Sequence, residues 1–255
     1  MSELSESSRL GSAKPIGGWR QSVLVFVMVL LPVPLASILF AVGAFAMVGW
    51  HWLYSQPFQI SAKASMISVL SLYAAISWID VALVWRWSSR RGFSRDVFIF
   101  HRPTWPDVAV GLVGFAVAMY GVPLLTRWLS HVTGGHGPVL PLDDAASLAT
   151  YILCVVVTAP VCEEVLYRGL LVAWLSRVGW RTPVMWLVGS LIFGASHLLF
   201  TGFLWSAVMV VFGAMLFGLR LWRRSLTPGW LAHFLFNAQL VIHPLISWLV
   251  PTLRP

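Results

Sequence analysis

Long apolar runs, separated by short polar segments, fill most of the chain. A transmembrane helix needs about 20 apolar residues to cross the ~30 Å hydrocarbon core of a bilayer. The runs therefore predict an all-α fold, a polytopic bundle of seven transmembrane helices, or eight if a long run divides at a proline such as Pro32, Pro34 or Pro160. They cover residues 22–50, 66–85, 108–125, 148–175, 183–200, 205–219 and 230–250.

The same pattern divides the chain into five segments. The first is rich in serine, glycine and charge, which is typical of disorder, and the third contains glycine, proline and the acidic pair Asp143 and Asp144. We expect a disordered cytoplasmic N-terminal arm (1–21), N-terminal transmembrane helices (22–125), an outer loop (126–147), a C-terminal helical core (148–250) and a short tail (251–255).

Composition places the chain in a membrane. Of its 255 residues, 58% are hydrophobic and 10% charged, whereas soluble domains average about 45–50% and 25%. The net charge of +8 does not indicate a nucleic-acid partner, because the basic residues fall in short clusters between apolar runs. Such clusters are typical of loops held at lipid headgroups, so we expect the bilayer as a partner and no nucleic acid.

The arginines also predict the direction of threading. They gather in every second connection, at 9–20, 86–102, 177–181 and 220–224, whereas the alternate connections contain only Lys63, Arg127 and Arg254. Cytoplasmic loops of membrane proteins retain positive charge. The N-terminus of this integral membrane protein is therefore expected in the cytoplasm.

Glu163 and Glu164 stand side by side in the fourth run, where an embedded carboxylate costs several kcal/mol unless something holds it there. In a helix Arg168 lies one turn from Glu164 and can pair with it, whereas Glu163 points about 100° away. Pairing keeps Glu164 ionised, while a less compensated Glu163 is suited to accepting a proton from water. Alternatively, the three side chains form a buried ion cluster that only fixes helix register.

Two later runs bring further polar side chains to a comparable depth. His197 lies near the end of the fifth run, and His233 and Asn237 lie one turn apart in the seventh. A lone histidine on an apolar helix is usually a packing residue, but three polar runs that converge favour a site. Asp80, alone in the second run, is interpreted as a packing contact.

Three strings in these runs resemble the motifs of one family, the CPBP intramembrane proteases, which includes the type II CAAX prenyl endopeptidase and bacteriocin self-immunity proteins. The motifs EExxxR, FxxxH and HxxxN occur in the family's order and on separate runs. The strings are Glu163-Glu164-Val-Leu-Tyr-Arg168, Phe193-Gly-Ala-Ser-His197 and His233-Phe-Leu-Phe-Asn237.

The resemblance implies an intramembrane endopeptidase that hydrolyses a peptide bond of a membrane-associated protein or peptide. In the implied mechanism Glu163 activates a water with the help of His197, while His233 and Asn237 stabilise the oxyanion. The short loops and compact form resemble bacterial members, so the expected location is a bacterial inner membrane.

The remaining motif residues, Glu164, Arg168 and Phe193, are expected to support the site. A metal-free, glutamic mechanism is favoured, with no cofactor. Zinc is the alternative, because Glu163, His197 and His233 would make a ligand set with one position left for water. However, no HExxH motif is present, and pairing with Arg168 makes Glu164 a poor base for that mechanism.

Two functions outside catalysis stay open. The same scaffold could be a peptide-binding or bacteriocin-immunity protein, in which the polar cluster recognises a peptide without cutting it. A proton-coupled transporter also fits, because a buried glutamate with histidine partners can relay protons. The transporter is the weaker alternative, since the chain has no clear internal repeat.

Overall fold

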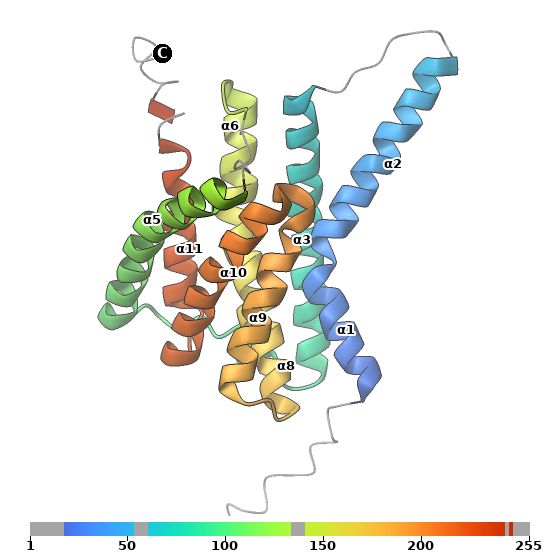
Figure 1. The fold of residues 1–255 in the computed structure, drawn as a ribbon. Coiled ribbons are helices and arrows are strands. Elements are labelled where there is room, and N and C mark those ends of the chain that lie inside the picture. Colours follow the sequence, from blue (N-terminus) through green and yellow to red (C-terminus); the bar gives the residue numbers. More distant parts are fainter. Residues whose placement is uncertain (1–17, 54–60, 134–140, 243–244, 247–255) are drawn as a thin grey trace, which may run out of the picture.

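The computed structural model describes residues 18–53, 61–133, 141–242 and 245–246. Within these ranges the chain forms helices and short connections, with no strand, which confirms the all-α prediction. Figure 1 shows the helices as a bundle in which most of the long helices run between two ends, while the 29-residue helix Trp105–Thr133 crosses obliquely. A central helical rod, residues Ala145–Arg177, is described below. The other helices are α1 (Trp19–Leu30), α2 (Pro32–Leu53), α3 (Ala62–Arg90), α4 (Ser94–Val97), α5 (Trp105–Thr133), α9 (Thr182–Ser196), α10 (Leu198–Arg223) and α11 (Thr227–Gln239).

Over the residues that the structure describes, the predicted apolar runs are largely helical, but several boundaries differ from those predicted. α11 ends at Gln239, inside the predicted run 230–250, whose residues 243–244 and 247–250 lie outside the described part. α1 begins at Trp19, inside the predicted arm, whose residues 1–17 lie outside the described part. α5 continues to Thr133, so the first part of the predicted outer loop is helical, because Trp128 and Val132 extend the apolar pattern past Arg127. The tail 251–255 also lies outside the described residues.

The first run bends where proline predicts it. α1 ends at Leu30 and α2 begins at Pro32, whose ring and missing N–H interrupt the helical hydrogen-bond ladder. A second bend, inside α10, lies at Gly202, whose φ of 77° belongs to the left-handed region that glycine adopts without a steric penalty.

A continuous rod of 33 residues, Ala145–Arg177, occupies the centre of the bundle. It begins where Asp144 caps the first turn by accepting a hydrogen bond from the Ser147 backbone N–H at 2.7 Å. Two stretches are π-helical, with wider turns and i→i+5 hydrogen bonds. The rod consists of α6 (Ala145–Tyr151), η2 (Ile152–Thr158), α7 (Ala159–Glu163), η3 (Glu164–Leu171) and α8 (Val172–Arg177).

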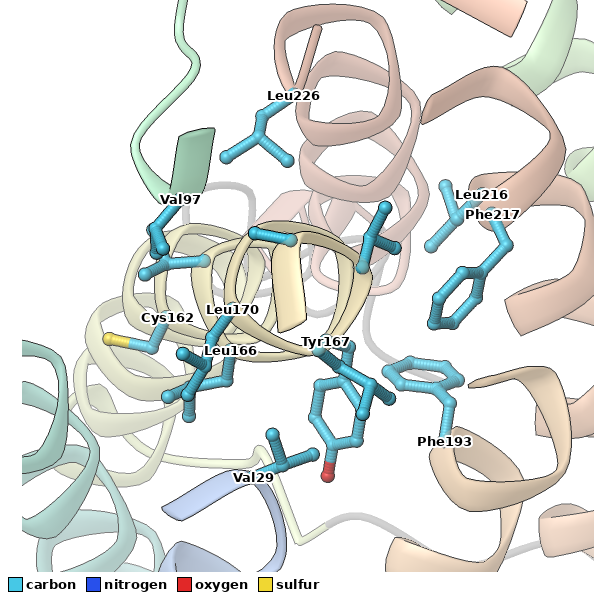
Figure 2. Close-up of a cluster of buried hydrophobic side chains, with 14 of the residues drawn as sticks. Val29, Val97, Cys162, Leu166, Tyr167, Leu170, Phe193, Leu216, Phe217 and Leu226 are labelled. Atoms are coloured by element: carbon cyan, nitrogen blue, oxygen red, sulfur yellow. The ribbon is translucent and has the colours of Figure 1, made fainter. Parts of the chain in front are cut away.

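The main hydrophobic core surrounds η3, and every residue of η3 is buried. Gly169 allows the backbone of α4 to approach, because a Cβ at this position would collide with the carbonyl oxygen of Val97. Figure 2 shows apolar side chains of several helices gathered around the rod, among them Val29, Val97, Phe193, Leu216, Phe217 and Leu226.

The arginine-bearing connections meet at one end of the bundle. Leu226 N–H donates to the carbonyl oxygen of Ile99 at 3.1 Å, and Arg177 pairs with Asp96 at 2.6 Å. At another site Lys63, at the start of α3, pairs with Asp144 at 2.6 Å, just before the rod begins. The contacts agree with the predicted grouping of connections, while the cytoplasmic location of the arginine end stays a prediction.

Among the residues that the structure describes, five helices are long and apolar enough to cross a membrane: Pro32–Gly49, Ala62–Arg90, Trp105–Val132, Ala145–Arg177 and Thr201–Arg223. α9 has 15 residues and α11 has 13, which at ~1.5 Å per residue is less than the ~30 Å of a hydrocarbon core. The described residues thus form a helical membrane protein, but they do not confirm a count of seven or eight spans.

Candidate active site

The two adjacent glutamates lie at the junction between α7 and η3, in the middle of the rod. Glu163 is 8% exposed and Glu164 is fully buried. Because they are neighbours on a helix, their carboxylates point to different sides and meet different partners. The residues that surround each carboxylate therefore decide what it can do.

Glu164 pairs with Arg168, as the spacing predicts. Arg168 Nη1 lies 3.3 Å from Glu164 Oε1, and both side chains are fully buried. The guanidinium also lies over the rings of Phe193 and Phe217, at 4.1 and 4.7 Å from their centroids. Aromatic faces attract a desolvated cation, so the pair is held inside the protein and not toward lipid.

Glu163 has a partner that the sequence did not reveal. The hydroxyl of Tyr73, on α3, donates a 2.6 Å hydrogen bond to Glu163 Oε1. No hydrogen bond reaches Oε2 from any residue that the structure describes. The prediction that Glu163 points away from Arg168 agrees with these contacts, but its carboxylate is oriented by Tyr73 and is not free.

His233, on α11, lies between the two carboxylates. Its Nε2 is 3.8 Å from Glu163 Oε2, and its Nδ1 is 3.4 Å from Glu164 Oε1. The ring of Phe212 packs edge-on against the imidazole, with centroids 5.4 Å apart. His233 is thus a link between the glutamates, a position that the EExxxR and HxxxN spacings did not indicate.

Gly229, one turn before His233, makes room for this arrangement. A Cβ added at Gly229 would lie 2.9 Å from Glu164 Oε2, closer than side-chain carbons approach an oxygen. Pro228 and Gly229 open α11, so the first turn of this helix lies against the buried carboxylate.

His197 lies at the turn between α9 and α10. The predicted run 183–200 had implied that it lies inside a single helix, and this was wrong. Its Nδ1 is 2.8 Å from the carbonyl oxygen of Phe193. A carbonyl oxygen only accepts, so Nδ1 carries the proton and Nε2 is left with a lone pair. The Phe193 ring lies 4.8 Å from the His197 ring and 6.3 Å from the His233 ring, centroid to centroid.

Asn237 is hydrogen-bonded to a backbone carbonyl of the rod that has no backbone N–H partner five residues later. Asn237 Nδ2 donates to the carbonyl oxygen of Val155 at 2.8 Å. In η2 the preceding carbonyl, that of Cys154, accepts from the N–H five residues later, at Ala159. The next donor in this series would be Pro160, which has no N–H, so the carbonyl of Val155 is available to Asn237.

The structure therefore brings Glu163, Glu164, Arg168 and His233 into one buried cluster. His197 lies beside it across Phe193, and Asn237 lies one turn beyond His233. No ion pair joins His197 to either glutamate within the described residues. Tyr73 and Gly229 were missed, because a tyrosine and a glycine carry no motif signal of their own.

The proposed zinc ligands do not form a metal site in this arrangement. Among the described residues no three His, Cys, Asp or Glu side chains are grouped closely enough to hold a metal ion. Nothing in the described cluster therefore fits Glu163, His197 and His233 as a ligand set, and no chemical step below depends on a metal.

Asp80 is buried on α3, 2% exposed, two turns beyond Tyr73. Neither of its carboxylate oxygens has a hydrogen-bond partner within the described residues, and the same is true of the Ser77 hydroxyl. Asp80 is thus buried without a hydrogen-bond partner among the described residues, and its role as a packing contact stays a prediction.

Comparison with protein families gives one match. Residues 145–239 match the family described as type II CAAX prenyl endopeptidase Rce1-like. This segment is a domain of the CPBP family. It begins with the first residue of α6 and ends with the last residue of α11, so it contains all three motifs. No curated protein and no solved structure matches the chain.

The Rce1-like domain carries the buried cluster except for Tyr73, which α3 supplies from outside the matched segment. The family match supports a protease, and the long apolar helices support a location in a membrane.

Proposed function

We propose that the protein is an intramembrane endopeptidase that hydrolyses a peptide bond of a membrane-associated protein or peptide. The observation that carries the proposal is the state of Glu163: Tyr73 fixes one carboxylate oxygen, and the other has no hydrogen bond within the described residues. A carboxylate held in this way inside an Rce1-like domain supports the proposal that Glu163 binds and activates a water.

In the proposed step Glu163 Oε2 takes a proton from water as the water oxygen attacks the carbonyl carbon of the substrate. The tetrahedral intermediate then breaks its C–N bond, and the proton passes to the leaving nitrogen. The products are a carboxylic acid and an amine, which then ionise to a carboxylate and an ammonium group. His233 Nε2 lies 3.8 Å from Glu163 Oε2 and is the group that we assign to receive and return this proton.

His197 and Asn237 are assigned the neighbouring roles. The lone pair on His197 Nε2, fixed by the hydrogen bond from Nδ1 to Phe193, can accept a second hydrogen bond from the water. Asn237 uses one of its two amide hydrogens on Val155, and the second is available to the oxyanion. His233 faces two carboxylates, so we assign it to proton transfer in preference to oxyanion binding.

We propose a glutamic and not a zinc-dependent mechanism. Its support is that water activation and oxyanion stabilisation both have candidate groups in the cluster without a metal. Glu164 is not a second base in this proposal, because its carboxylate is paired with Arg168. The substrate class includes a C-terminal tail, a leader peptide or a small membrane protein, cleaved in an inner bacterial membrane.

The test compares protein C-termini by proteomics in cells that make the wild-type protein, Glu163→Gln or Asp80→Asn at equal levels. Glu163→Gln removes the proposed base and should abolish cleavage, with a monodisperse, folded protein. Asp80→Asn is the matched control, because it also converts a buried carboxylate to an amide, outside the cluster. It should retain cleavage.

The non-catalytic functions predict other results. An immunity or peptide-binding protein would protect or bind as well in Glu163→Gln as in the wild type, with no new C-termini in either. A proton-coupled transporter would show gradient-dependent uptake in liposomes. Either result would refute the protease.

A further inference from the structure

A cavity of about 360 Å³ lies at the arginine end of the bundle, and neither Glu163 nor Glu164 is among the residues that line it. It is bounded by α4 and the connection that follows it, by α8 and by the end of α10. Its wall includes the apolar side chains of Ile99 and Val172, and three arginines face it, Arg177, Arg220 and Arg224, against one acid, Asp96.

The charges of the residues that line this cavity do not balance one another. Three guanidinium groups against one carboxylate leave a net charge of +2 among its lining residues. Asp96 is already paired with Arg177, at 2.6 Å. Neither Arg220 nor Arg224 forms an ion pair in the described part of the chain. The lining therefore favours an anion.

Arg220 is the informative member of the set. It is 8% exposed, unusual for an arginine. Its Nε donates to the carbonyl oxygen of Arg168 at 3.1 Å, while its Nη atoms make no hydrogen bond to the described residues. Burying a guanidinium without an anion is costly, and two parallel N–H groups match two oxygens of a phosphate.

Arg224 is held at the rim by an uncommon backbone conformation. Its φ is 52° and its ψ is 30°, in the left-handed region, and its N–H donates to the carbonyl oxygen of Arg220 at 2.9 Å. Non-glycine residues at positive φ are infrequent. This conformation ends α10 and leaves Arg224 on the same cavity as Arg220.

We propose that this cavity binds a phosphate-bearing anion, and that its source is the headgroup of an anionic phospholipid. The arginine connections lie at this end, where headgroups would meet the protein, and basic pockets between membrane helices are suited to such headgroups. The apolar wall of Ile99 and Val172 can contact the first acyl carbons. The proposal does not depend on the proposed protease activity.

The bound anion would also affect the rod, through Arg220. Arg220 holds the main-chain oxygen of Arg168, the residue that pairs with Glu164. A phosphate on the Nη atoms would fix the Arg220 side chain and with it the contact between α10 and η3. Binding should therefore raise the thermal stability of the whole bundle.

The test uses the full chain purified in a neutral detergent. It is titrated separately with short-chain phosphatidylglycerol, short-chain phosphatidylcholine and inorganic phosphate, while Tm is followed and bound lipid is counted by native mass spectrometry. Phosphatidylglycerol should bind and raise Tm, and phosphatidylcholine should do neither. A phosphate ion that raises Tm equally and displaces phosphatidylglycerol would overturn the lipid as the source in favour of a soluble anion.

Variants locate the site. Arg224→Gln should weaken phosphatidylglycerol binding about tenfold, the effect of one charged hydrogen bond. Arg181→Gln is the matched control, since Arg181 is exposed at the same end but outside the cavity, and it should bind as the wild type does. Arg220→Gln should also weaken binding, but it can disturb folding through Arg168, so the decision rests on Arg224. Equal binding by Arg224→Gln and the wild type would overturn the proposal.

Discussion

The central rod and helix α2 are both long and strongly apolar, with mean hydropathies of 2.0 and 1.9 over their candidate spans, yet they have opposite surroundings. Half of the rod's window is buried inside the protein, against 17% for α2. Phe45 of α2 is 81% exposed, whereas Trp174 of the rod is fully buried. Hydropathy therefore does not tell which helix faces lipid.

Charge makes the distinction. α2 contains no Asp, Glu, Lys or Arg, whereas the rod carries Glu163, Glu164 and Arg168 at its centre, all of them buried. Ionised groups in a membrane are tolerated where protein surrounds them and supplies partners. The rod is therefore the helix whose substitutions should have large effects, and the following variants test this contrast in descending order of effect.

Arg168→Leu should have the largest effect on stability. It leaves the buried Glu164 carboxylate without its cation, which costs about 3–5 kcal/mol of unfolding free energy for a buried pair. Phe45→Ala on α2 should change stability far less, because Phe45 is exposed. Denaturant titration in mixed micelles measures both, and equal losses would contradict the contrast.

Removing both charges distinguishes the contribution of the ion pair to stability from that of the surrounding aromatic rings. The double variant Glu164→Leu with Arg168→Leu should recover much of the loss, because no unpaired charge remains. A double variant as unstable as Arg168→Leu alone would show that the aromatic rings around the guanidinium, and not the ion pair, carry the stability.

Tyr73→Phe should lower the rate of peptide cleavage about 10- to 100-fold, the effect of one hydrogen bond of about 1.5–3 kcal/mol to a charged group. It removes the hydroxyl that orients Glu163. The cleavage rate of an identified substrate measures it, with Trp78→Phe as control, since Trp78 on the same helix donates to Thr158 and not to a glutamate. Equal rates in wild type and Tyr73→Phe would remove Tyr73 from the site.

Asp80→Leu should act in the opposite direction to Arg168→Leu. Asp80 is a buried carboxylate whose two oxygens have no hydrogen-bond partner within the described residues, so its replacement by an apolar side chain should raise the unfolding free energy by about 1–3 kcal/mol. Thermal melting at neutral pH measures this. A lower Tm would show that Asp80 has a partner and belongs with the glutamates.

Lys63→Gln should have the smallest effect, because its ion pairs with Asp143 and Asp144 are exposed and screened by solvent. Hydrogen bonding from Lys63 lowers the pKa of Asp144 to about 2, whereas an unfolded Asp titrates near 3.9. The stabilisation is therefore present above about pH 3.9 and lost as the pH falls toward 2. Wild type and variant should differ slightly in Tm at pH 6 and converge near pH 2.

Much of the fold was predictable because membrane helices leave a simple pattern. The apolar runs are largely helical over their described residues, and Pro32, one of the prolines expected to bend a run, begins the helix after the bend. The ends of helices were less predictable: α5 ran into the expected loop, and His197 lies at a turn. A hydropathy pattern does not distinguish a helix end from a turn that is itself apolar.

The motif residues and the Glu164–Arg168 pair were predictable for a different reason. An i,i+4 spacing brings two side chains together whatever the rest of the chain does. Asn237 shows the limit of this argument: its position on α11 was evident, but its hydrogen bond to Val155 depends on a π-helical turn that ends at a proline. That backbone geometry has no signature in residue spacing.

The sequence by itself determined that this chain is a helical membrane protein with acids and histidines in an Rce1-like domain, because apolar length and local spacing are properties of short segments. Only the tertiary structure decided that Tyr73 orients Glu163, that His233 lies between both glutamates and that Arg220 reaches the rod. These contacts join helices that are distant in the chain. They depend on how the bundle packs, and packing is set by all of its surfaces together.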